Sequence, residues 1–568
     1  MPRSFLPLFL ILLSGAMFRA IGLDFGLPHI LHQDEPIVIN HALAYGTGDL
    51  NPHFFIIPPL CSYILFILYG FFYVVGMVTG LFHGIDDFAY LYVNDPTAFF
   101  IIARVFLGIL PAVMGIFLVY RLFKDFFGSE IGAIFASFFT SVSFIGVVNA
   151  HYGYTDNLMV MFVLLAVLYL YRLVKSPCPV NYVLSGVFIG LAVGTKYNAA
   201  VLAVSLAWAH CAVLLGRRGR KNGHLWLMFL AAAAVFTVVF IGVNPFSVLD
   251  REHFLRTVFG GIRHGRMGWD YHLRYSMVEG IGILPVVLGL TGFAAILFRT
   301  NFRTSLLFLS FPVMFYVHLV FASQRYARYG LPLLPFFAMA AAYLLFVFPG
   351  RRGENGPGRF LVIALALAAL VPTAVMSVKA DILFSGPDTR VVSAKWIEEN
   401  IPEGTRIAVD NTSFRPQIYQ TKEQLEDKSA ITDRQFGLGA AKKKKLGYML
   451  KSAENKRTYN VYFFIPEGKT GGQFLSTMPT IAYDVSELKR SGIEYVVINL
   501  QTVGVSKDNL MASLSGKAVP VKTFSPYNDG RNRAPYDMAD ATFMAVSARE
   551  LFSRKMTGPC ITIYKLEL

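Results

Sequence analysis

Charged residues are scarce in this sequence. They make up 15% of its 568 residues, whereas soluble globular proteins carry about 25%. Hydrophobic residues make up 55% of the chain, and the mean hydropathy is +0.51. This composition excludes an ordinary soluble protein and predicts an integral, multi-pass membrane protein.

Cysteine is also scarce, which restricts the cross-links and metal sites that are possible. The four cysteines lie in a hydrophobic segment, a predicted loop, a predicted span and the C-terminal region: Cys61, Cys178, Cys211 and Cys560. No two of them are placed to meet, so we expect no disulfide and no cysteine-based metal site. Four histidines, His29, His32, His41 and His53, share no tight ligand spacing. We therefore expect neither a metal nor another cofactor.

Long hydrophobic runs are abundant. Eleven of them are candidates to span a membrane: residues 5–23, 99–120, 130–150, 157–171, 182–196, 198–216, 225–243, 279–298, 304–322, 330–348 and 360–378. A short basic loop follows every even-numbered run, for example Arg121 to Lys124 and Arg217 to Lys221. Positive loops favour the cytoplasmic side. The residues after 379 are therefore predicted to be extracytoplasmic, and a bacterial inner membrane is the expected location.

Residues 55–82 are also apolar enough to span, but a crossing there would place every later basic loop outside. Pro58-Pro59 and the interruptions at Gly70 and Gly76 suit a helix in the outer leaflet. We interpret this segment as a juxtamembrane or re-entrant helix. The predicted fold is thus polytopic and α-helical, with about eleven transmembrane helices plus juxtamembrane helices.

The net charge of +15 is concentrated in the membrane region. Residues from 380 onward contain 26 Lys+Arg and 21 Asp+Glu, which leaves a charge of +10 before that point. Most of the excess lies in short loops, so topology and phosphate binding explain it better than nucleic-acid binding. Nucleic acid is not an expected partner.

Three acidic residues are predicted to share the outer membrane face: Asp34 and Glu35 after the first run, and Asp156 before the fourth. Carboxylates are costly close to a bilayer and persist there when they bind or react with something. The alternative interpretation is helix capping, because each acid precedes a predicted helix. The predicted topology therefore places candidate reactive groups on one side of the membrane.

Residues 380–568 have the composition of a water-soluble domain and follow a membrane domain of residues 1–379. Strand-like runs occur at 405–410, 460–465, 494–500 and 560–566, with helical patterns between them. This alternation predicts an α/β layer. No nucleophile triad, P-loop or Cys/His cluster is present in it.

The order of several motifs resembles GT-C class membrane glycosyltransferases, and is similar to protein O-mannosyltransferases and lipid A aminoarabinose transferases. The motifs are Arg19, Asp34-Glu35, Pro58-Pro59-Leu60, Ala103-Arg104, Asp156, Gly194-Thr195-Lys196-Tyr197 and Arg328-Tyr329-Gly330-Leu331-Pro332. The resemblance covers residues 1 to about 350. It implies inverting transfer of a hexosyl or pentosyl group from a polyprenyl-phosphate carrier to an extracytoplasmic lipid, glycan or protein.

The resemblance also implies roles for individual residues. Asp34 matches the first-loop acid and is the candidate base, Glu35 would orient the acceptor or the sugar, and Asp156 would bind sugar hydroxyls or steer Asp34. Cations of the outer face are candidates for the carrier phosphate: Arg104, Lys196, His264, His272, Arg274 and Arg328. The alternative for these cations is snorkelling at the membrane interface.

A transporter or flippase of lipid-linked sugars would also need many spans and phosphate-binding cations. Transporters carry their polar groups near the bilayer midplane, often in two repeated halves. Here the acids and cations gather at one face and no internal repeat is visible. The sequence therefore favours the enzyme, with a lipid-linked donor, an acceptor and membrane lipids as its partners.

Overall fold

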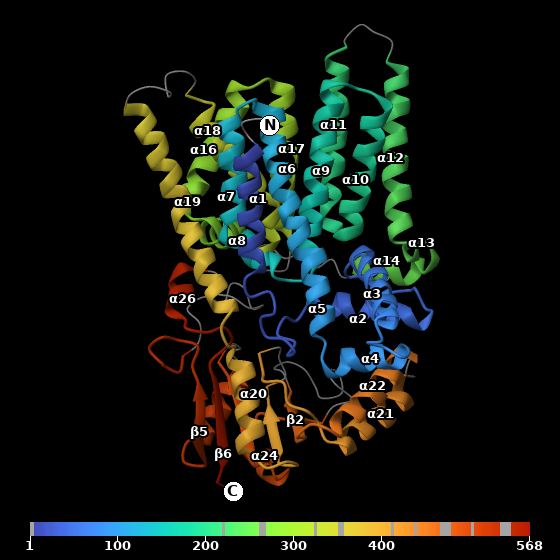
Figure 1. Cartoon of the computed structure of the whole chain (residues 1–568), viewed down its shortest axis with the longest axis vertical. Coiled ribbons are helices and arrows are strands. Elements are labelled where there is room, and N and C mark those ends of the chain that lie inside the picture. Colours follow the sequence, from blue (N-terminus) through green and yellow to red (C-terminus); the bar gives the residue numbers. More distant parts are fainter. Residues whose placement is uncertain are drawn as a thin grey trace.

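The computed structural model describes residues 5–217, 222–260, 268–322, 326–349, 357–410, 414–436, 440–465, 479–500, 505–533 and 547–567. Figure 1 shows a layer of roughly parallel helices above a smaller α/β region. The helices of the upper layer are α1 (Phe5–Ala20), α5 (Thr97–Ala103), α6 (Leu110–Phe127), α7 (Glu130–Val142), α8 (Phe144–Ala150), α9 (Thr155–Lys175), α10 (Pro179–Thr195), α11 (Leu202–Leu215), α12 (Gly223–Val243), α16 (Ile283–Arg299), α17 (Phe302–Phe321), α18 (Leu334–Phe346) and α19 (Pro357–Phe384).

The chain is an integral, multi-pass membrane protein. Eight of its described helices are long and apolar enough to cross a membrane, or up to ten if each of two bent pairs is one span. A helix coincides with each of the eleven predicted runs, but α1 and α10 are shorter than a typical span. The predicted membrane fold is therefore confirmed, whereas the number eleven is not.

The two bent pairs have local causes. The first bends by 54° between α7 and α8, where Ser143 adopts an extended conformation. The second bends by 116° between residues 272–281 and α16, where Gly282 has a φ of 97°. Only glycine adopts such a conformation readily. These bends lie at the end of the helical layer that faces the sheet (Figure 1).

The described residues of the predicted basic loops, among them Arg121, Arg172 and Arg299, lie at the other end of the helical layer (Figure 1). Helices α6, α9, α11, α16 and α18 each end at the top of Figure 1, opposite the sheet. The positive loops predicted that the loops after the even-numbered runs share one side and that the residues after 379 lie on the other. The arrangement agrees with this prediction.

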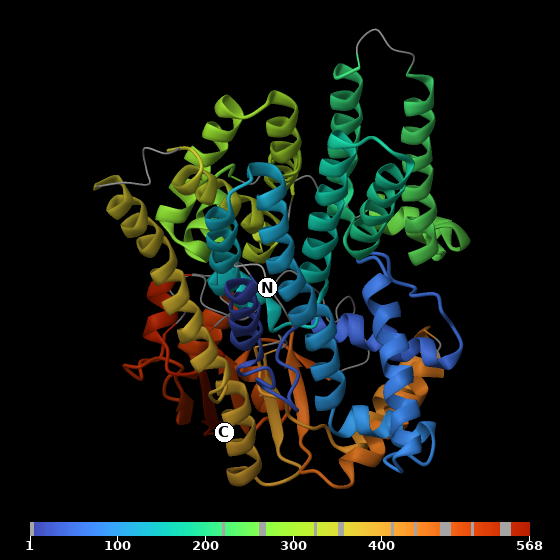
Figure 2. The ribbon, with the colours of Figure 1, turned by 45° about the horizontal axis from the view of Figure 1, so that its top comes forward.

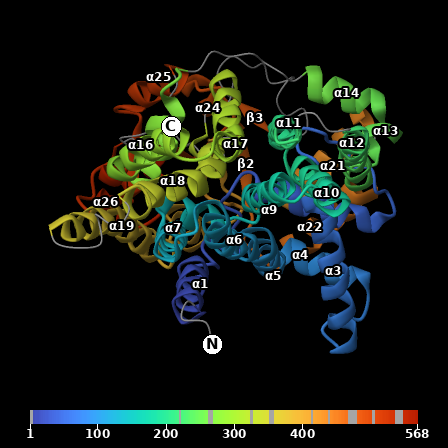
Figure 3. The same cartoon turned by 90° about the horizontal axis from the view of Figure 1, so that it is seen from above.

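The first long connection contributes three helices close to the sheet: α2 (Glu35–Ala44), α3 (Leu60–Val78) and α4 (Ile85–Asn94). Figures 1 and 3 show that α3 runs across the direction of the spanning helices, although its length and composition would allow it to span. This orientation supports the predicted juxtamembrane placement. Large apolar side chains remain exposed along α3, including Ile67, Phe71 and Val78.

The C-terminal region contains a six-stranded sheet with the order β3-β2-β1-β4-β6-β5. Its strands are β1 (Arg406–Val409), β2 (Asn460–Phe464), β3 (Thr480–Ile481), β4 (Tyr495–Asn499), β5 (Ala518–Phe524) and β6 (Ile561–Leu566). The first four pair in parallel, and β6 pairs antiparallel with β4 and β5. The flanking helices are α20 (Thr389–Asn400), α21 (Lys422–Phe436), α22 (Ala440–Ala453), α24 (Val485–Arg490), α25 (Val505–Leu514) and α26 (Ala548–Ser553). The predicted α/β layer is confirmed.

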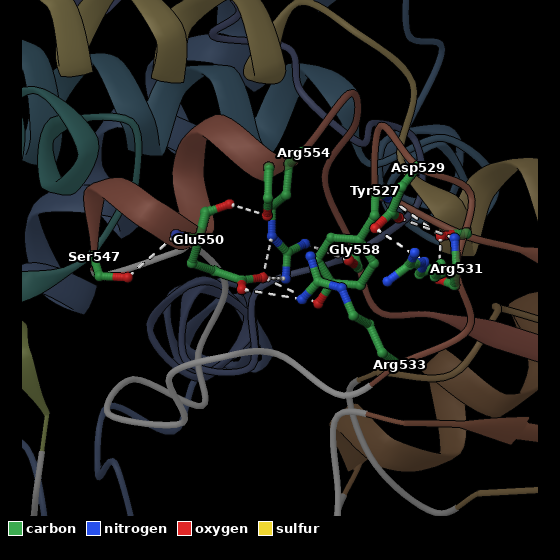
Figure 4. Close-up of polar contacts among 10 residues, drawn as sticks. Tyr527, Asp529, Arg531, Arg533, Ser547, Glu550, Arg554 and Gly558 are labelled. Atoms are coloured by element: carbon green, nitrogen blue, oxygen red, sulfur yellow. Dashed lines mark hydrogen bonds and ion pairs between the residues drawn. The ribbon is translucent and has the colours of Figure 1, made fainter.

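A buried polar network around Glu550 lies near the end of the C-terminal region (Figure 4). Glu550 accepts hydrogen bonds from Arg554 at 2.8 Å and from the Tyr527 hydroxyl at 3.0 Å. The Lys379 ammonium, which lies on α19, donates to the Arg554 carbonyl at 2.8 Å. The network therefore ties the last helix of the membrane layer to the C-terminal region.

The first connection also binds the C-terminal region directly. The Arg390 guanidinium donates to the Leu31 carbonyl at 2.9 Å, and the Ile30 amide donates to the Gln417 side chain at 3.2 Å. Figure 2 shows α4 beside α22. The segment that carries Asp34 and Glu35 is thus held between the two layers.

Candidate active site

Asp34 directly precedes α2, but its side chain does not cap that helix. Instead it forms an ion pair with Arg328, which belongs to the 3-10 helix η5 (Ala327–Leu333). The Asp34 side chain keeps 17% of its surface exposed. The capping interpretation is therefore excluded for this side chain. Its partner Arg328 is a cation that the predicted topology places on the same side of the membrane as Asp34.

Asp156 connects the same arginine to a second cation. It lies in the first turn of α9, accepts a hydrogen bond from the Lys196 ammonium at 2.7 Å, and lies 4.0 Å from the Arg328 Nε. Lys196 follows α10 in an extended conformation. Asp34, Arg328, Asp156 and Lys196 thus form one cluster, called here the charge network, in which two acids balance two cations.

Aromatic rings frame the cations of the charge network. The Lys196 ammonium lies 4.3 Å from the centre of the Tyr329 ring, and the Arg328 guanidinium lies 4.7 Å from that of Tyr326. Such contacts stabilise a cation without neutralising it. The rings therefore stabilise both cations in addition to their carboxylate partners.

Glu35 is directed away from this cluster. It is fully buried and forms a bidentate ion pair with Arg104, with distances of 2.9 and 3.1 Å. The Gly153 amide donates a further hydrogen bond to Glu35 at 2.8 Å. Arg104 in turn donates to the Leu23 carbonyl at 2.6 Å. The structure therefore joins Glu35 and Arg104 to each other rather than to the charge network.

Arg104 begins η2 (Arg104–Ile109), a π-helix inserted between α5 and α6. A π-helix holds one extra residue in its turn and is frequent at functional sites. A second π-helix, η4 (His272–Val278), begins at His272. Two predicted site residues thus lie where a helix departs from regular geometry.

His32 is a site residue that the sequence did not single out, although it lies close to the acidic pair. Its Nδ1 accepts hydrogen bonds from the Asp34 and Glu35 amides, each at 3.2 Å. Its buried Nε2 has no hydrogen-bond partner among the described residues. Burial, followed by the charge of Arg328, lowers the pKa of His32 well below its ordinary value. The ring is therefore neutral, with its proton on Nε2.

A small cleft adjoins these groups, with a volume of about 10 Å³. Its lining includes His32, Tyr152, Tyr154, Asp156 and Arg328. Such a volume holds about one water molecule, so a larger ligand requires the charge network to open. Within the described part of the chain, no group of three His, Cys, Asp or Glu side chains is placed to hold a metal ion.

The remaining predicted cations are not joined to the charge network in the described parts of the chain. His272 is buried and contacts the Ser276 hydroxyl at 2.8 Å, and the exposed Arg274 lies over the Tyr275 ring. Their helix packs near Arg328, because a Cβ at Gly330 would lie 2.3 Å from the Ser276 Cβ. His264 lies outside the described residues.

Residues 99–241 match the family model described as dolichyl-phosphate-mannose-protein mannosyltransferase. The predicted resemblance to GT-C membrane glycosyltransferases is confirmed at this level. The matched segment contains Arg104, Asp156 and Lys196. No curated protein matches the chain.

The chain is similar to solved structures at low sequence identity. ArnT from Cupriavidus metallidurans bound to undecaprenyl phosphate has 14% identity and a TM-score of 0.49, covering 98% of this chain and 97% of that one. The archaeal oligosaccharyltransferase AglB from Archaeoglobus fulgidus, in complex with an inhibitory peptide and a dolichol-phosphate, has 12% identity and a TM-score of 0.45. That match covers 88% of this chain and 69% of AglB.

Proposed function

We propose that the protein is an inverting glycosyltransferase that takes a hexosyl or pentosyl group from a polyprenyl-phosphate carrier. The acceptor would be an extracytoplasmic lipid, glycan or protein, and the C-terminal region would lie on that side of the membrane. The observation that carries the proposal is the charge network, in which two cations next to a partly exposed carboxylate offer both a phosphate site and a base.

Asp34 is the proposed base because its side chain is more exposed than that of Asp156, at 17% against 5%. In the reaction, an acceptor oxygen attacks the anomeric carbon while the bond from that carbon to the phosphate oxygen breaks. The acceptor proton moves to an Asp34 oxygen, and the electron pair leaves with the polyprenyl phosphate.

Arg328 and Lys196 are the proposed phosphate ligands. Each is already paired with a carboxylate, so a phosphate that takes the place of that carboxylate keeps the cation paired. Charge-assisted hydrogen bonds to phosphate are strong, and they strengthen as the leaving phosphate gains charge. The exchange would also release Asp34 from Arg328, so donor binding and activation of the base are coupled.

The other predicted residues receive supporting roles in this proposal. Asp156 holds both cations and can bind sugar hydroxyls or steer Asp34. Glu35 and Arg104 are positioning residues, because their bidentate pair fixes the segment that carries Asp34. The neutral His32 offers its Nε2 proton to an oxygen of the sugar or phosphate. His264, His272 and Arg274 remain predicted contacts of the carrier.

The test is a transfer assay with the purified protein in nanodiscs and a radiolabelled polyprenyl-phosphate sugar, using membrane extracts as the source of acceptor. The wild type should release free polyprenyl phosphate and label an acceptor, whereas Asp34→Asn should not. Asp24→Asn, an exposed acid of the same connection, is the matched control and should behave as the wild type. Movement of the carrier across the bilayer with no sugar transfer would instead identify a flippase.

A further inference from the structure

Two adjoining cavities lie between the first connection and the C-terminal region. The larger, called here the apolar cavity, measures about 570 Å³ and lies between α2, α3, α4 and α22, with Phe66, Tyr69, Tyr73 and Phe88 among its lining. The smaller, called here the basic cavity, measures about 270 Å³. Both are lined by Tyr92, Val93 and Lys445, so these residues lie between the two cavities.

The basic cavity contains three cations, Arg415, Lys428 and Lys445, and no acidic residue appears among the described residues that line it. The Arg415 guanidinium lies 4.3 Å from the centre of the Phe463 ring. Its buried Nη1 has no hydrogen-bond partner in the described ranges. A buried donor without a partner costs free energy, so this guanidinium is suited to receive an anionic oxygen.

The cations also repel one another. Burial lowers the pKa of Arg415 to about 10. Burial lowers the pKa of Lys428, with Arg415 as the second cause, and the pKa of Lys445, with Lys428 as the second cause. The Lys445 side chain is exposed, and its ammonium donates a hydrogen bond at 3.0 Å to the side-chain oxygen of Asn40, which lines the apolar cavity. An anion in the basic cavity would relieve this repulsion.

The apolar cavity is within reach of the membrane. Its wall includes one side of α3, whose other side exposes Ile67, Phe71 and Val78. Such an apolar face on a helix that runs across the bundle suits the outer leaflet of the membrane (Figure 3). Its volume lies within the range of about 300 to 1,000 Å³ of small-molecule sites, which suits a hydrocarbon chain better than a complete polyprenyl carrier.

We propose that the two cavities together bind an anionic phospholipid of the membrane. One acyl chain occupies the apolar cavity, and the phosphate lies beside Arg415 and Lys445 in the basic cavity. This site is separate from the charge network, because Asp34 precedes the N-terminal end of α2 whereas the cavity contacts the opposite end, from Asn40 to Ala44. The bound lipid would link the first connection, which supplies the chain site, to the C-terminal region, which supplies the cations.

The test measures lipid retention by native mass spectrometry after transfer of the full-length protein from nanodiscs of phosphatidylcholine with a minor fraction of phosphatidylglycerol. The wild type should retain phosphatidylglycerol over phosphatidylcholine. The double variant Arg415→Gln and Lys445→Gln should lose this preference by about tenfold or more, since two charge-assisted contacts are removed. Lys395→Gln, which removes an exposed charge on α20, is the matched control.

A second variant tests the acyl-chain site without changing charge. Gly70 lines the apolar cavity, and a Cβ placed there meets nothing within 4 Å. Gly70→Leu should therefore fold while filling the cavity, and it should reduce phosphatidylglycerol retention. Asp34→Asn should retain the lipid as the wild type does, even if it abolishes transfer, which separates this site from the proposed reaction.

Three outcomes would overturn the assignment. They are equal retention of both phospholipids by the wild type, unchanged retention in both the double variant and Gly70→Leu, and displacement of phosphatidylglycerol by an equimolar polyprenyl phosphate. The last outcome would assign the cavities to the carrier rather than to a phospholipid of the membrane.

Discussion

Asp34 and Glu35 are neighbours in the chain, yet their surroundings are opposite. Glu35 is fully buried, and Arg104 and the Gly153 amide satisfy it with three hydrogen bonds. Asp34 is partly exposed and pairs with Arg328, a cation that also faces Asp156. Consecutive residues at a helix start project in different directions, so two identical charges can serve as a fixed support and as an exchangeable partner.

The largest effect is expected when Asp34 loses its ability to accept a proton. Asp34→Asn preserves size but removes proton acceptance, so single-turnover transfer should fall by a factor on the order of 10² to 10⁴. Thermal stability and yield should remain close to the wild type, because the Glu35–Arg104 pair is intact. Transfer within a factor of about three of the wild type would move the role of base to Asp156.

Glu35→Gln should produce the opposite result, a loss of stability. Removing one partner of a buried ion pair leaves the Arg104 charge without compensation, which costs about 3 to 5 kcal/mol. The measurement is thermal unfolding in detergent. The double variant Glu35→Gln and Arg104→Met should recover part of the loss, since no lone charge remains. A stable Glu35→Gln variant without transfer activity would place Glu35 in the reaction instead.

The sequence predicted which charges share a membrane face but not which of them pair. Hydropathy and the positive loops were sufficient to place Asp34, Asp156, Lys196 and Arg328 at one end of the helical layer, because both signals depend only on local composition. The division between Asp34 and Glu35 was not visible, since it depends on where the π-helix that begins at Arg104 places this side chain. His32 was missed because its role arises from backbone hydrogen bonds.

The sheet was also predicted only in part from local composition. Strands β1, β2, β4 and β6 were predicted because each is a short apolar run, and most of their residues are buried. Strand β5 was not predicted, because most of its residues are exposed and it contains Pro520 next to a bulge. Such a strand lies at an edge and has no hydrophobic alternation.

A smaller effect is expected when Arg328, a cation of the charge network, is substituted. Arg328→Gln should weaken the binding of polyprenyl phosphate by about tenfold, because a charge-assisted contact is lost. Arg328→Lys should recover only part of the affinity, since an ammonium lacks the fork of a guanidinium. Microscale thermophoresis of the protein in nanodiscs can measure the affinity of both variants for polyprenyl phosphate. Unchanged binding in both variants would make Arg328 a support for Asp34 alone.

The smallest effect concerns His32, whose pKa is lowered by burial. The unfolded chain takes up a proton near the ordinary pKa of about 6.5, whereas the folded chain does not until a lower pH. This part of the stability is present above pH 6.5 and declines as the pH falls, by about 1 kcal/mol at pH 5.5.

The variant His32→Asn isolates this contribution. It retains an acceptor for the two amides but cannot titrate, so its unfolding temperature should depend less on pH between 7.5 and 5.5. The measurement is the difference between the unfolding temperatures at pH 7.5 and pH 5.5, determined for the variant and for the wild type. An identical pH dependence in both proteins would show that His32 is not the titrating group.

The separation of the paired residues along the chain sets the order in which the two carboxylates find their partners during synthesis. Glu35 and Arg104 are 69 positions apart, whereas Asp34 and Arg328 are 294 apart. At a translation rate of about 5 to 20 residues per second, Arg104 emerges roughly 3 to 14 s after Glu35, and Arg328 roughly 15 to 60 s after Asp34. The nascent protein can therefore anchor its first connection early, while the reactive carboxylate waits for most of the membrane region to be inserted.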